Sequence, residues 1–351
     1  MRKAFLNTAP EKILIILLSS IGDILLTTPV IRLLKKKFPG SKIDFIIKNQ
    51  FAQVLADHPQ IDKFYIFEKH VETNSLLAIK KEIRQQQYDL IVDLHKNIRS
   101  YFLTIGSRAK TILHYNKGIV QRFFYVKFKL KFFKEIVPAY LKYIKSLKPY
   151  EIEDDRQGLD FYLDTKVADQ IRQRFGYFWQ DNNHSIIGIV PGAHHPTKRW
   201  TSEGFSAVIN YLVDKGNYKI ILFGNRDDRE IVASLDIHSS PNVLNTTGEL
   251  SLRETGALMD FCDVVVTNDS GLMHLASALK KKVVAIFGST TEELGFFPYL
   301  TEHIIVQNNS LKCRPCSHIG RKKCPKKHFK CMKEIPAGQV IDALENIFAR
   351  T

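Results

Sequence analysis

The sequence predicts an α/β protein made of two doubly wound domains that face a cleft. Apolar, β-branched runs alternate with helical patterns over residues 12–100, and the same alternation restarts at residue 185. This spacing is typical of crossovers in a parallel sheet. A length of 351 residues suits two domains of ordinary size. In such sheets, ligands bind at the carboxyl ends of the strands.

The first domain is predicted over residues 1–165. Its strands are expected at 12–18, 43–47, 63–67 and 89–93, and its helices at 23–38, 51–57 and 75–86. Residues 117–148 interrupt this pattern with a basic, aromatic stretch. Residues 150–165 are expected to form a connector with one extended segment.

The second domain is predicted over residues 166–351. It is expected to begin with a helix over 167–182 that ends near Trp179. Strands are expected at 185–190, 219–223, 242–245, 263–267, 283–287 and 303–306, and helices at 201–215, 227–236, 251–260, 271–279 and 337–349. The last helix either stays with this domain or packs back on the first.

Positive charge is concentrated in the first half of the chain. Residues 1–150 hold 27 lysines and arginines against 11 acidic residues, whereas residues 151–351 hold 24 against 25. Such a surface attracts an anionic substrate, an anionic membrane or nucleic acid, or simply aids solubility. Nucleic acid is disfavoured because no nucleic-acid-binding motif is present. The apolar run 13–18 is too short to span a membrane and reads as a buried strand, so we expect a cytoplasmic protein.

The first turn of interest follows the first predicted strand. Gly22 forms the turn and Asp23 begins the next helix, where the helix dipole favours an ionised carboxylate. A carboxylate at the cleft can accept a proton from a hydroxyl nucleophile. The alternative is an N-terminal capping aspartate, which is common.

Two turns in the second half carry phosphate-binding chemistry. After strand 185–190, Gly192 keeps the backbone accessible, Thr197 supplies a hydroxyl and Lys198 a mobile cation. After strand 263–267, the turn Asp269-Ser270-Gly271 opens a helix whose free N–H groups attract a phosphate. No P-loop is present, which disfavours ATPase chemistry. An ordinary surface loop and an ordinary capped turn are the alternatives.

Two further turns are expected near the same cleft edge. Gly224 is followed by Arg226, Asp227 and Asp228, where the two aspartates either hold a ribose or only cap a helix. Gly288 belongs to the last turn of this kind.

Together these motifs resemble one enzyme family. Three motifs occur in this order along the chain. The first is Ser19-Ser-Ile-Gly-Asp23 with Thr28-Pro29, and the second is the run from Pro191-Gly-Ala to Lys198-Arg-Trp200. The third is Asn268-Asp-Ser-Gly with His274-Leu-Ala, followed by Phe287-Gly-Ser-Thr. They resemble the bacterial ADP-heptose:lipopolysaccharide heptosyltransferases of glycosyltransferase family 9. The likeness runs from about residue 12 to the C-terminus, and the cysteine-rich tail is most similar to the heptosyltransferase II branch.

The resemblance implies a GT-B fold of two Rossmann-like domains and an inverting transfer that requires no cofactor. It implies an acceptor site for an anionic lipid A-core sugar on the first domain and an ADP-heptose site on the second. It further implies that Asp23 is the general base and that Lys198 stabilises the diphosphate. Donor binding by Gly192, Thr197, Asp269, Ser270, Gly271, His274, Asp227 and Gly288 is expected from the same resemblance and turns. Some family members carry an acidic residue where Arg226 stands here.

A single displacement requires a base on the acceptor side and charge stabilisation on the leaving-group side. Because Asp23 and Lys198 come from different halves, closure of the cleft is expected to assemble the site. The alternatives are a family 9 transferase with another nucleotide sugar, and a non-catalytic nucleotide- or nucleic-acid-binding protein.

The basic, aromatic segment 117–148 carries nine lysines and arginines, one acid and eight aromatic residues. Such a segment can lie on an anionic bilayer, so we expect peripheral contact with the inner face of the cytoplasmic membrane. An amphipathic helix with a phenylalanine core is the alternative. Within and before this segment, Arg122, Lys96 and Arg99, together with Gly22, are the expected acceptor-binding residues.

Four cysteines crowd the tail: Cys313, Cys316, Cys324 and Cys331. They could form a structural zinc site, although the second pair is seven residues apart, which is loose spacing for a zinc ribbon. Reduced structural thiols or an adventitious disulfide are the alternatives. Nine lysines and arginines and no acid lie between Gln307 and Lys333, which is expected to favour thiolates.

Overall fold

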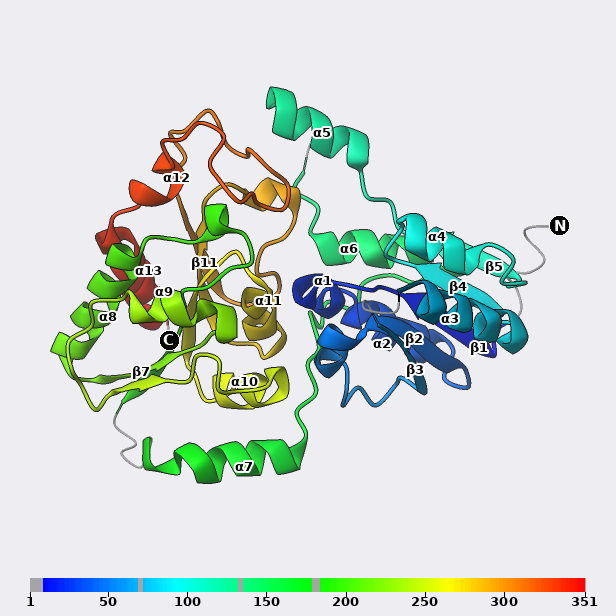
Figure 1. Cartoon of the computed structure of the whole chain (residues 1–351), viewed down its shortest axis with the longest axis horizontal. Coiled ribbons are helices and arrows are strands. Elements are labelled where there is room, and N and C mark those ends of the chain that lie inside the picture. Colours follow the sequence, from blue (N-terminus) through cyan, green and yellow to red (C-terminus); the bar gives the residue numbers. More distant parts are fainter. Residues whose placement is uncertain (1–8, 69–71, 132–134, 179–183, 351) are drawn as a thin grey trace. The chain divides into compact units, whose positions relative to one another are not determined.

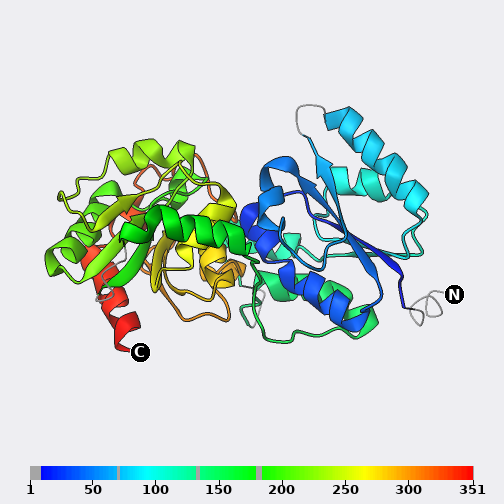
Figure 2. The same ribbon diagram turned by 90° about the horizontal axis from the view of Figure 1, so that it is seen from below.

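The computed structural model describes residues 9–68, 72–131, 135–178 and 184–350, and its chain forms two compact units. The first unit runs to Gly118 and resumes over Ala139–Tyr162, and the second holds Ile119–Pro138 and the chain from Leu163 onward. Each unit is a parallel sheet covered by helices (Figures 1 and 2). This confirms the predicted α/β class.

The first unit contains a five-stranded sheet in the order β3-β2-β1-β4-β5. Its strands are β1 (Lys12–Ile16), β2 (Lys42–Lys48), β3 (Lys63–Phe67), β4 (Leu90–Asp93) and β5 (Thr111–His114), and all neighbours are parallel. The chain leaves β1 toward β2 and β3 and then returns to β4 on the other side. The strand order therefore reverses between β1 and β4, which is where ligands bind in open α/β sheets.

Only one helix of the first unit closely matches the sequence prediction, the one expected over 75–86. They are α1 (Ile21–Leu25), α2 (Thr28–Lys37), α3 (Glu72–Gln86), α4 (Ile98–Thr104) and α6 (Ala139–Ile144), with 3₁₀ turns over Asn49–Val54 and Lys145–Tyr150. The single helix predicted over 23–38 is wrong. Its break falls at Thr27, whose hydroxyl donates to the Ile24 carbonyl, and Pro29 in the next turn has no N–H to continue the ladder. The helix predicted over 51–57 is the first of the two 3₁₀ turns.

The second unit contains a six-stranded sheet in the order β11-β10-β9-β6-β7-β8. Its strands are β6 (Ser185–Val190), β7 (Tyr218–Leu222), β8 (Val243–Asn245), β9 (Val264–Asn268), β10 (Lys282–Phe287) and β11 (His303–Gln307), all with parallel neighbours. These strands lie within one or two residues of their predicted positions. The order reverses between β6 and β9, so the turns after these two strands meet at the switch point.

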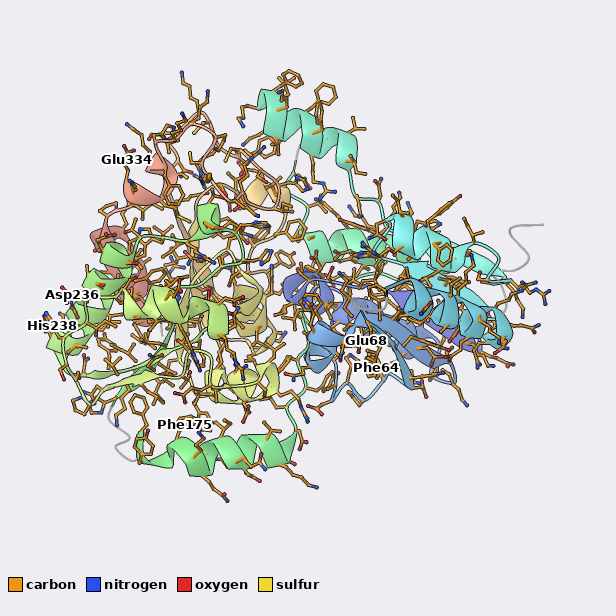
Figure 3. All side chains as sticks on the ribbon, viewed as in Figure 1. Phe64, Glu68, Phe175, Asp236, His238 and Glu334 are labelled. Atoms are coloured by element: carbon orange, nitrogen blue, oxygen red, sulfur yellow. The ribbon has the colours of Figure 1, made fainter. Side chains whose placement is uncertain are left out.

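Helices cover both the sheet and its connections in the second unit. They are α5 (Ile119–Phe128), α7 (Thr165–Phe175), α8 (Ser202–Lys215), α9 (Arg229–Ala233), α10 (Leu252–Met259), α11 (Gly271–Ala278), α12 (Lys330–Lys333) and α13 (Ala337–Ala349). Phe175 closes α7, and Asp236 and His238 lie on the segment that is hydrogen-bonded to α8 (Figure 3). The predicted helix end near Trp179 lies outside the described residues.

Tertiary packing assigns two further segments to the second unit. Helix α13 contributes Val340, Leu344 and Ile347 to the core of the second unit. Residues 119–138 also belong to the second unit, whereas the sequence analysis places them in the first domain. Tyr125 is buried there, and its hydroxyl lies 3.1 Å from Thr291 Oγ1.

A buried ion cluster ties the connector to the first unit. Arg32 on α2 donates to both carboxylate oxygens of Asp155, at 2.9 and 3.0 Å, and also to Asp160 and to the Gly158 carbonyl. Burial alone would raise the pKa of Asp155. The hydrogen bond and the positive charge of Arg32 lower it by more than burial raises it, so the pKa lies below its ordinary value. The cluster joins α2 to residues 155–160.

We expect Arg32→Met to lower the free energy of unfolding by about 3 kcal/mol, because it leaves two carboxylates without their buried cation. Urea unfolding measures this loss. Lys37→Met, at an exposed position on the same helix, is the control and should change stability by less than about 0.5 kcal/mol. Equal stability of the two variants would contradict a structural role for the cluster.

Candidate functional site

Asp23 lies where the chain leaves β1, at the switch point of the first sheet. Its carboxylate accepts hydrogen bonds from the Ser20 backbone at 3.2 Å and the Ser20 hydroxyl at 2.8 Å. The Tyr143 hydroxyl donates to the other oxygen at 3.2 Å. Asp23 is thus the N3 residue of a capping box, so the capping role foreseen as an alternative is present. Gly22 beside it is buried.

The turn after β4 forms the other side of this switch point. Asp93 is buried and accepts from the backbone N–H groups of His95 and Lys96 at 3.0 and 2.8 Å, and from the Ser100 hydroxyl at 2.9 Å. These bonds hold Lys96 at a positive φ of 45° and lead into α4. They place exposed Lys96 and half-buried Arg99 on the same short segment.

His95 is a site residue that no sequence motif indicated. Burial and the charge of Lys117 lower its pKa to about 4, although Asp93 and Asp23 act in the opposite direction. Near neutral pH, its imidazole is therefore uncharged. The available signal was its position directly after β4, the strand that pairs with β1.

In the second unit, Lys198 and Asp269 form an ion pair across the switch point. Lys198 Nζ lies 2.8 Å from Asp269 Oδ2, and both side chains are largely buried. The Thr290 hydroxyl donates to the same oxygen at 2.6 Å. The turns after β6, β9 and β10 are thus joined at one carboxylate. An ammonium group has three donors, so its contact with Asp269 leaves further donors for an anion.

The residues next to Asp269 lead into the N-terminus of α11. Asn268 accepts from the Trp200 backbone at 2.9 Å and donates to the Pro191 carbonyl at 2.8 Å, which joins the turns after β6 and β9. Ser270 is the N-cap of α11 but makes no side-chain capping bond. The Ser270 side chain therefore does not occupy the N–H groups of the first turn. An anion site requires such N–H groups. His274 is buried one turn later.

Gly192 leaves room for the carboxylate of Asp228. A Cβ at position 192 would lie 2.2 Å from Asp228 Oδ1. Asp228 is buried and completes a capping box with Asn225, and burial raises its pKa. The helix-cap interpretation therefore applies to Asp228. Asp227 is exposed on the same turn.

The cysteine-rich tail braces these turns from outside the sheet. Thr197 accepts from the Arg321 backbone at 2.7 Å and donates to its carbonyl at 3.0 Å, and Ser289 donates to the Thr197 hydroxyl at 3.0 Å. Arg314 donates to the carbonyls of Gly288, Phe287 and Thr290. It also donates to Gln307, the last residue of β11, and to Asn308 after it. Neither arginine was predicted to have a role.

The expectation that the tail favours thiolates is wrong for two of its cysteines. Burial raises the pKa of Cys331 to about 12 and also raises that of Cys316, despite nearby arginines. Cys313 Sγ lies 3.9 Å from His328 Nε2. Within the described residues, which include all four tail cysteines, no group of three or more His, Cys, Asp or Glu side chains is arranged to hold a metal.

Two predicted residues have structural surroundings that the sequence did not reveal. Gly288 packs closely against the Met332 side chain. A Cβ added at position 288 would lie only 2.5 Å from Met332 Cε. Arg122 lies on α5 and thus in the second unit, whereas Gly22, Lys96 and Arg99 lie in the first.

Comparisons with known proteins agree with these motifs. Residues 76–328 match the family described as glycosyltransferase family 9 (heptosyltransferase). The chain is 29% identical to lipooligosaccharide heptosyltransferase 2 of Campylobacter jejuni over 344 residues, which cover 96% of this chain and 98% of the relative.

Solved structures share the fold over nearly the whole chain. A family 9 glycosyltransferase from Veillonella parvula has a TM-score of 0.81 at 24% identity, covering 97% of this chain and 98% of the other. The ADP-heptose lps heptosyltransferase II of Escherichia coli has a TM-score of 0.72 at 21% identity, covering 97% and 99%.

We expect the stability of the first unit to fall as the pH drops from 7 to 5, in part through His95. Its folded pKa of about 4 lies below the ordinary 6.5, so the unfolded chain binds the proton more readily in this window. His95→Gln should remove about 1–2 kcal/mol of this loss, as measured by urea unfolding at both pH values. Exposed His238→Gln serves as the control; an unchanged pH slope in the His95 variant would refute the assignment.

We expect Arg314→Met to loosen the turn after β10, because five carbonyl or amide oxygens lose a charged donor. The free energy of unfolding should fall by about 2–4 kcal/mol. Hydrogen exchange of residues 287–291 should accelerate in the variant and remain unchanged in Lys312→Met, an exposed neighbour. Equal exchange in both variants would argue against the brace.

Proposed function

The chain belongs to glycosyltransferase family 9, the heptosyltransferases, and on this premise we propose that it is an inverting enzyme that transfers a heptose from ADP-heptose to the inner core of lipopolysaccharide. The names of its relatives supply this donor and acceptor class. The observation that carries the proposal is the Lys198–Asp269 pair beside the N-terminus of α11. It provides a cation and backbone N–H groups at one strand switch point, as a diphosphate requires.

The donor diphosphate is proposed to bind at this point. Lys198 contacts its oxygens, and the turn Asp269-Ser270-Gly271 presents backbone amides. Gly192 and Thr197 shape the neighbouring turn, and His274 supports the helix from inside. The remaining donor contacts are assigned to Asp227, for the ribose, and to Gly288.

Asp23 is proposed as the general base. The acceptor hydroxyl loses its proton to the Asp23 carboxylate while its oxygen bonds to the anomeric carbon of the heptose. The bond from that carbon to the diphosphate breaks on the opposite face, so the configuration inverts and ADP departs. Lys198 stabilises the charge that develops on the leaving diphosphate. The step uses only side chains and backbone groups of this chain.

The acceptor is proposed to be an anionic lipid A-core sugar. Lys96, Arg99 and Arg122 supply cations, and Gly22 lies beside Asp23 in α1. Because this acceptor is lipid-linked, we place the protein at the inner face of the cytoplasmic membrane as a peripheral protein. None of the described helices combines the length and apolar character needed to span a bilayer.

We expect Asp23→Asn to lower kcat roughly 10²–10⁴-fold with little change in ADP affinity, because an amide accepts no proton. Turnover of ADP-heptose on a truncated core acceptor and calorimetry with ADP measure the two quantities. Ser20→Ala is the matched control, since it removes a capping bond but keeps the carboxylate. If Ser20→Ala and Asp23→Asn lowered kcat equally, Asp23 would act only as a cap. Turnover with other nucleotide sugars in place of ADP-heptose would favour the alternative donor.

We expect Lys198→Met to raise the donor KM and lower kcat, together by roughly 10²–10³-fold in kcat/KM. Since this variant leaves Asp269 buried without its cation, the double variant Lys198→Met/Asp269→Asn separates folding from chemistry. The double variant should regain thermal stability but not turnover. Recovery of turnover in the double variant would show that the lysine is only structural.

A further inference from the structure

Helix α5 presents its apolar side chains to the outside. Ile119, Val120, Phe123 and Phe128 are 54–67% exposed, whereas Tyr125 is 4% exposed. In a surface helix of a water-soluble protein the apolar stripe normally faces the core. The exposed apolar side chains of α5 are therefore a feature that needs an apolar partner.

Polar contacts fix this orientation from the inner side. The Tyr125 hydroxyl lies 3.1 Å from Thr291 Oγ1, and Lys131 Nζ lies 2.7 Å from Glu293 Oε1. Lys129 donates to the Pro315 carbonyl. Each of these contacts is made within the second unit.

The outer face combines aromatic rings with cations. Phe123 and Phe128 have ring centroids 6.2 Å apart, and Phe124 lies 5.7 Å from each of them. Lys127 is exposed between these rings in the sequence, and Leu130 extends the apolar surface at 49% exposure. Aromatic side chains next to lysines are typical of segments that lie at a membrane interface.

The first unit carries a second exposed stripe of the same kind. Ile98, Tyr101 and Ile105 recur at helical spacing along and just beyond α4 and are 89%, 62% and 50% exposed. Lys96 and Arg99 accompany them, and both are acceptor-binding residues in the proposed function. Each unit thus has an outward apolar stripe accompanied by cations.

We propose that α5 is a membrane-docking helix carried by the second, donor-binding unit, and that its partner is an anionic lipid bilayer. This inference rests on the proposed function in one respect, because a lipid-linked acceptor brings the enzyme to that surface. The ten residues of α5 are about 15 Å long, too short to cross the roughly 30 Å hydrocarbon core, so the helix lies in the interfacial plane.

Charge favours a bilayer over a second copy of the chain. Packing two α5 faces together would bring the exposed Lys127 side chains of both copies into proximity, and α5 itself carries no acidic residue to pair with them. An anionic headgroup layer neutralises the same cations while the phenylalanines enter the acyl boundary.

The test is co-sedimentation of the full-length protein with phosphatidylglycerol/phosphatidylethanolamine vesicles and with phosphatidylcholine vesicles. We expect preference for the anionic vesicles, weakened by salt. The variant Phe123→Ser/Phe128→Ser should reduce binding roughly tenfold or more. The matched control Leu77→Ser/Tyr177→Ser removes two apolar side chains of comparable exposure elsewhere and should bind as the wild type does.

Activity separates this inference from the proposed function. With ADP-heptose and a delipidated, soluble acceptor, the Phe123/Phe128 variant should turn over as fast as the wild type, and only turnover on vesicle-embedded acceptor should fall. Vesicle binding equal in wild type and variant would overturn the docking surface. The docking surface would also be overturned if the wild type did not bind vesicles and light scattering showed that it forms a dimer that the variant abolishes. Absent turnover on the soluble acceptor would instead count against the proposed function.

Discussion

The carboxylate of Asp269 joins three turns of the second sheet. It pairs with Lys198 from the turn after β6 and accepts from Thr290 in the turn after β10, while its own turn follows β9. This meeting depends on the strand order, because β9 and β10 pair directly and β6 lies on the other side of β9. Lys198 is thereby held beside the N-terminus of α11. The reversal of strand order between β6 and β9 is thus what positions the Lys198 cation at this site.

The first unit repeats the arrangement with different chemistry. Its strand order also reverses beside its first strand, and the turns after β1 and β4 carry Asp23 and Asp93. Here the carboxylates accept hydrogen bonds from hydroxyl and backbone groups, and His95 lies near them as a neutral imidazole. The two switch points therefore differ in charge: the first holds the carboxylates of Asp23 and Asp93, whereas the second holds the Lys198–Asp269 ion pair. This division fits the proposed roles of proton acceptor and leaving-group stabiliser.

Segments outside the sheets hold the second site in place. Arg314 and Arg321 from the cysteine-rich tail bond to the turns that contain Thr290 and Thr197. Tyr125 of α5 reaches Thr291 in the same region. The tail and the basic, aromatic segment, which the sequence separates by almost two hundred residues, thus brace neighbouring turns of one unit. Cys316 is part of this brace, because its backbone N–H donates to the Ser289 carbonyl at 3.0 Å. Burial keeps Cys316 and Cys331 as thiols near neutral pH.

The sequence by itself determined the α/β class, nearly every strand and the turns around Asp23, Lys198 and Asp269, because buried parallel strands are long apolar runs and glycine turns interrupt them visibly. Only the tertiary structure decided the break of the first helix at Thr27 and the unit to which α5 belongs. It alone also showed that Thr290, Arg314 and His95 belong to the surroundings of the two switch points. Those outcomes depend on contacts between residues far apart in the chain, such as Tyr125 with Thr291, and local periodicity carries no information about them. Burial likewise keeps Cys316 and Cys331 protonated, since desolvation outweighs the charge pattern that the sequence displays.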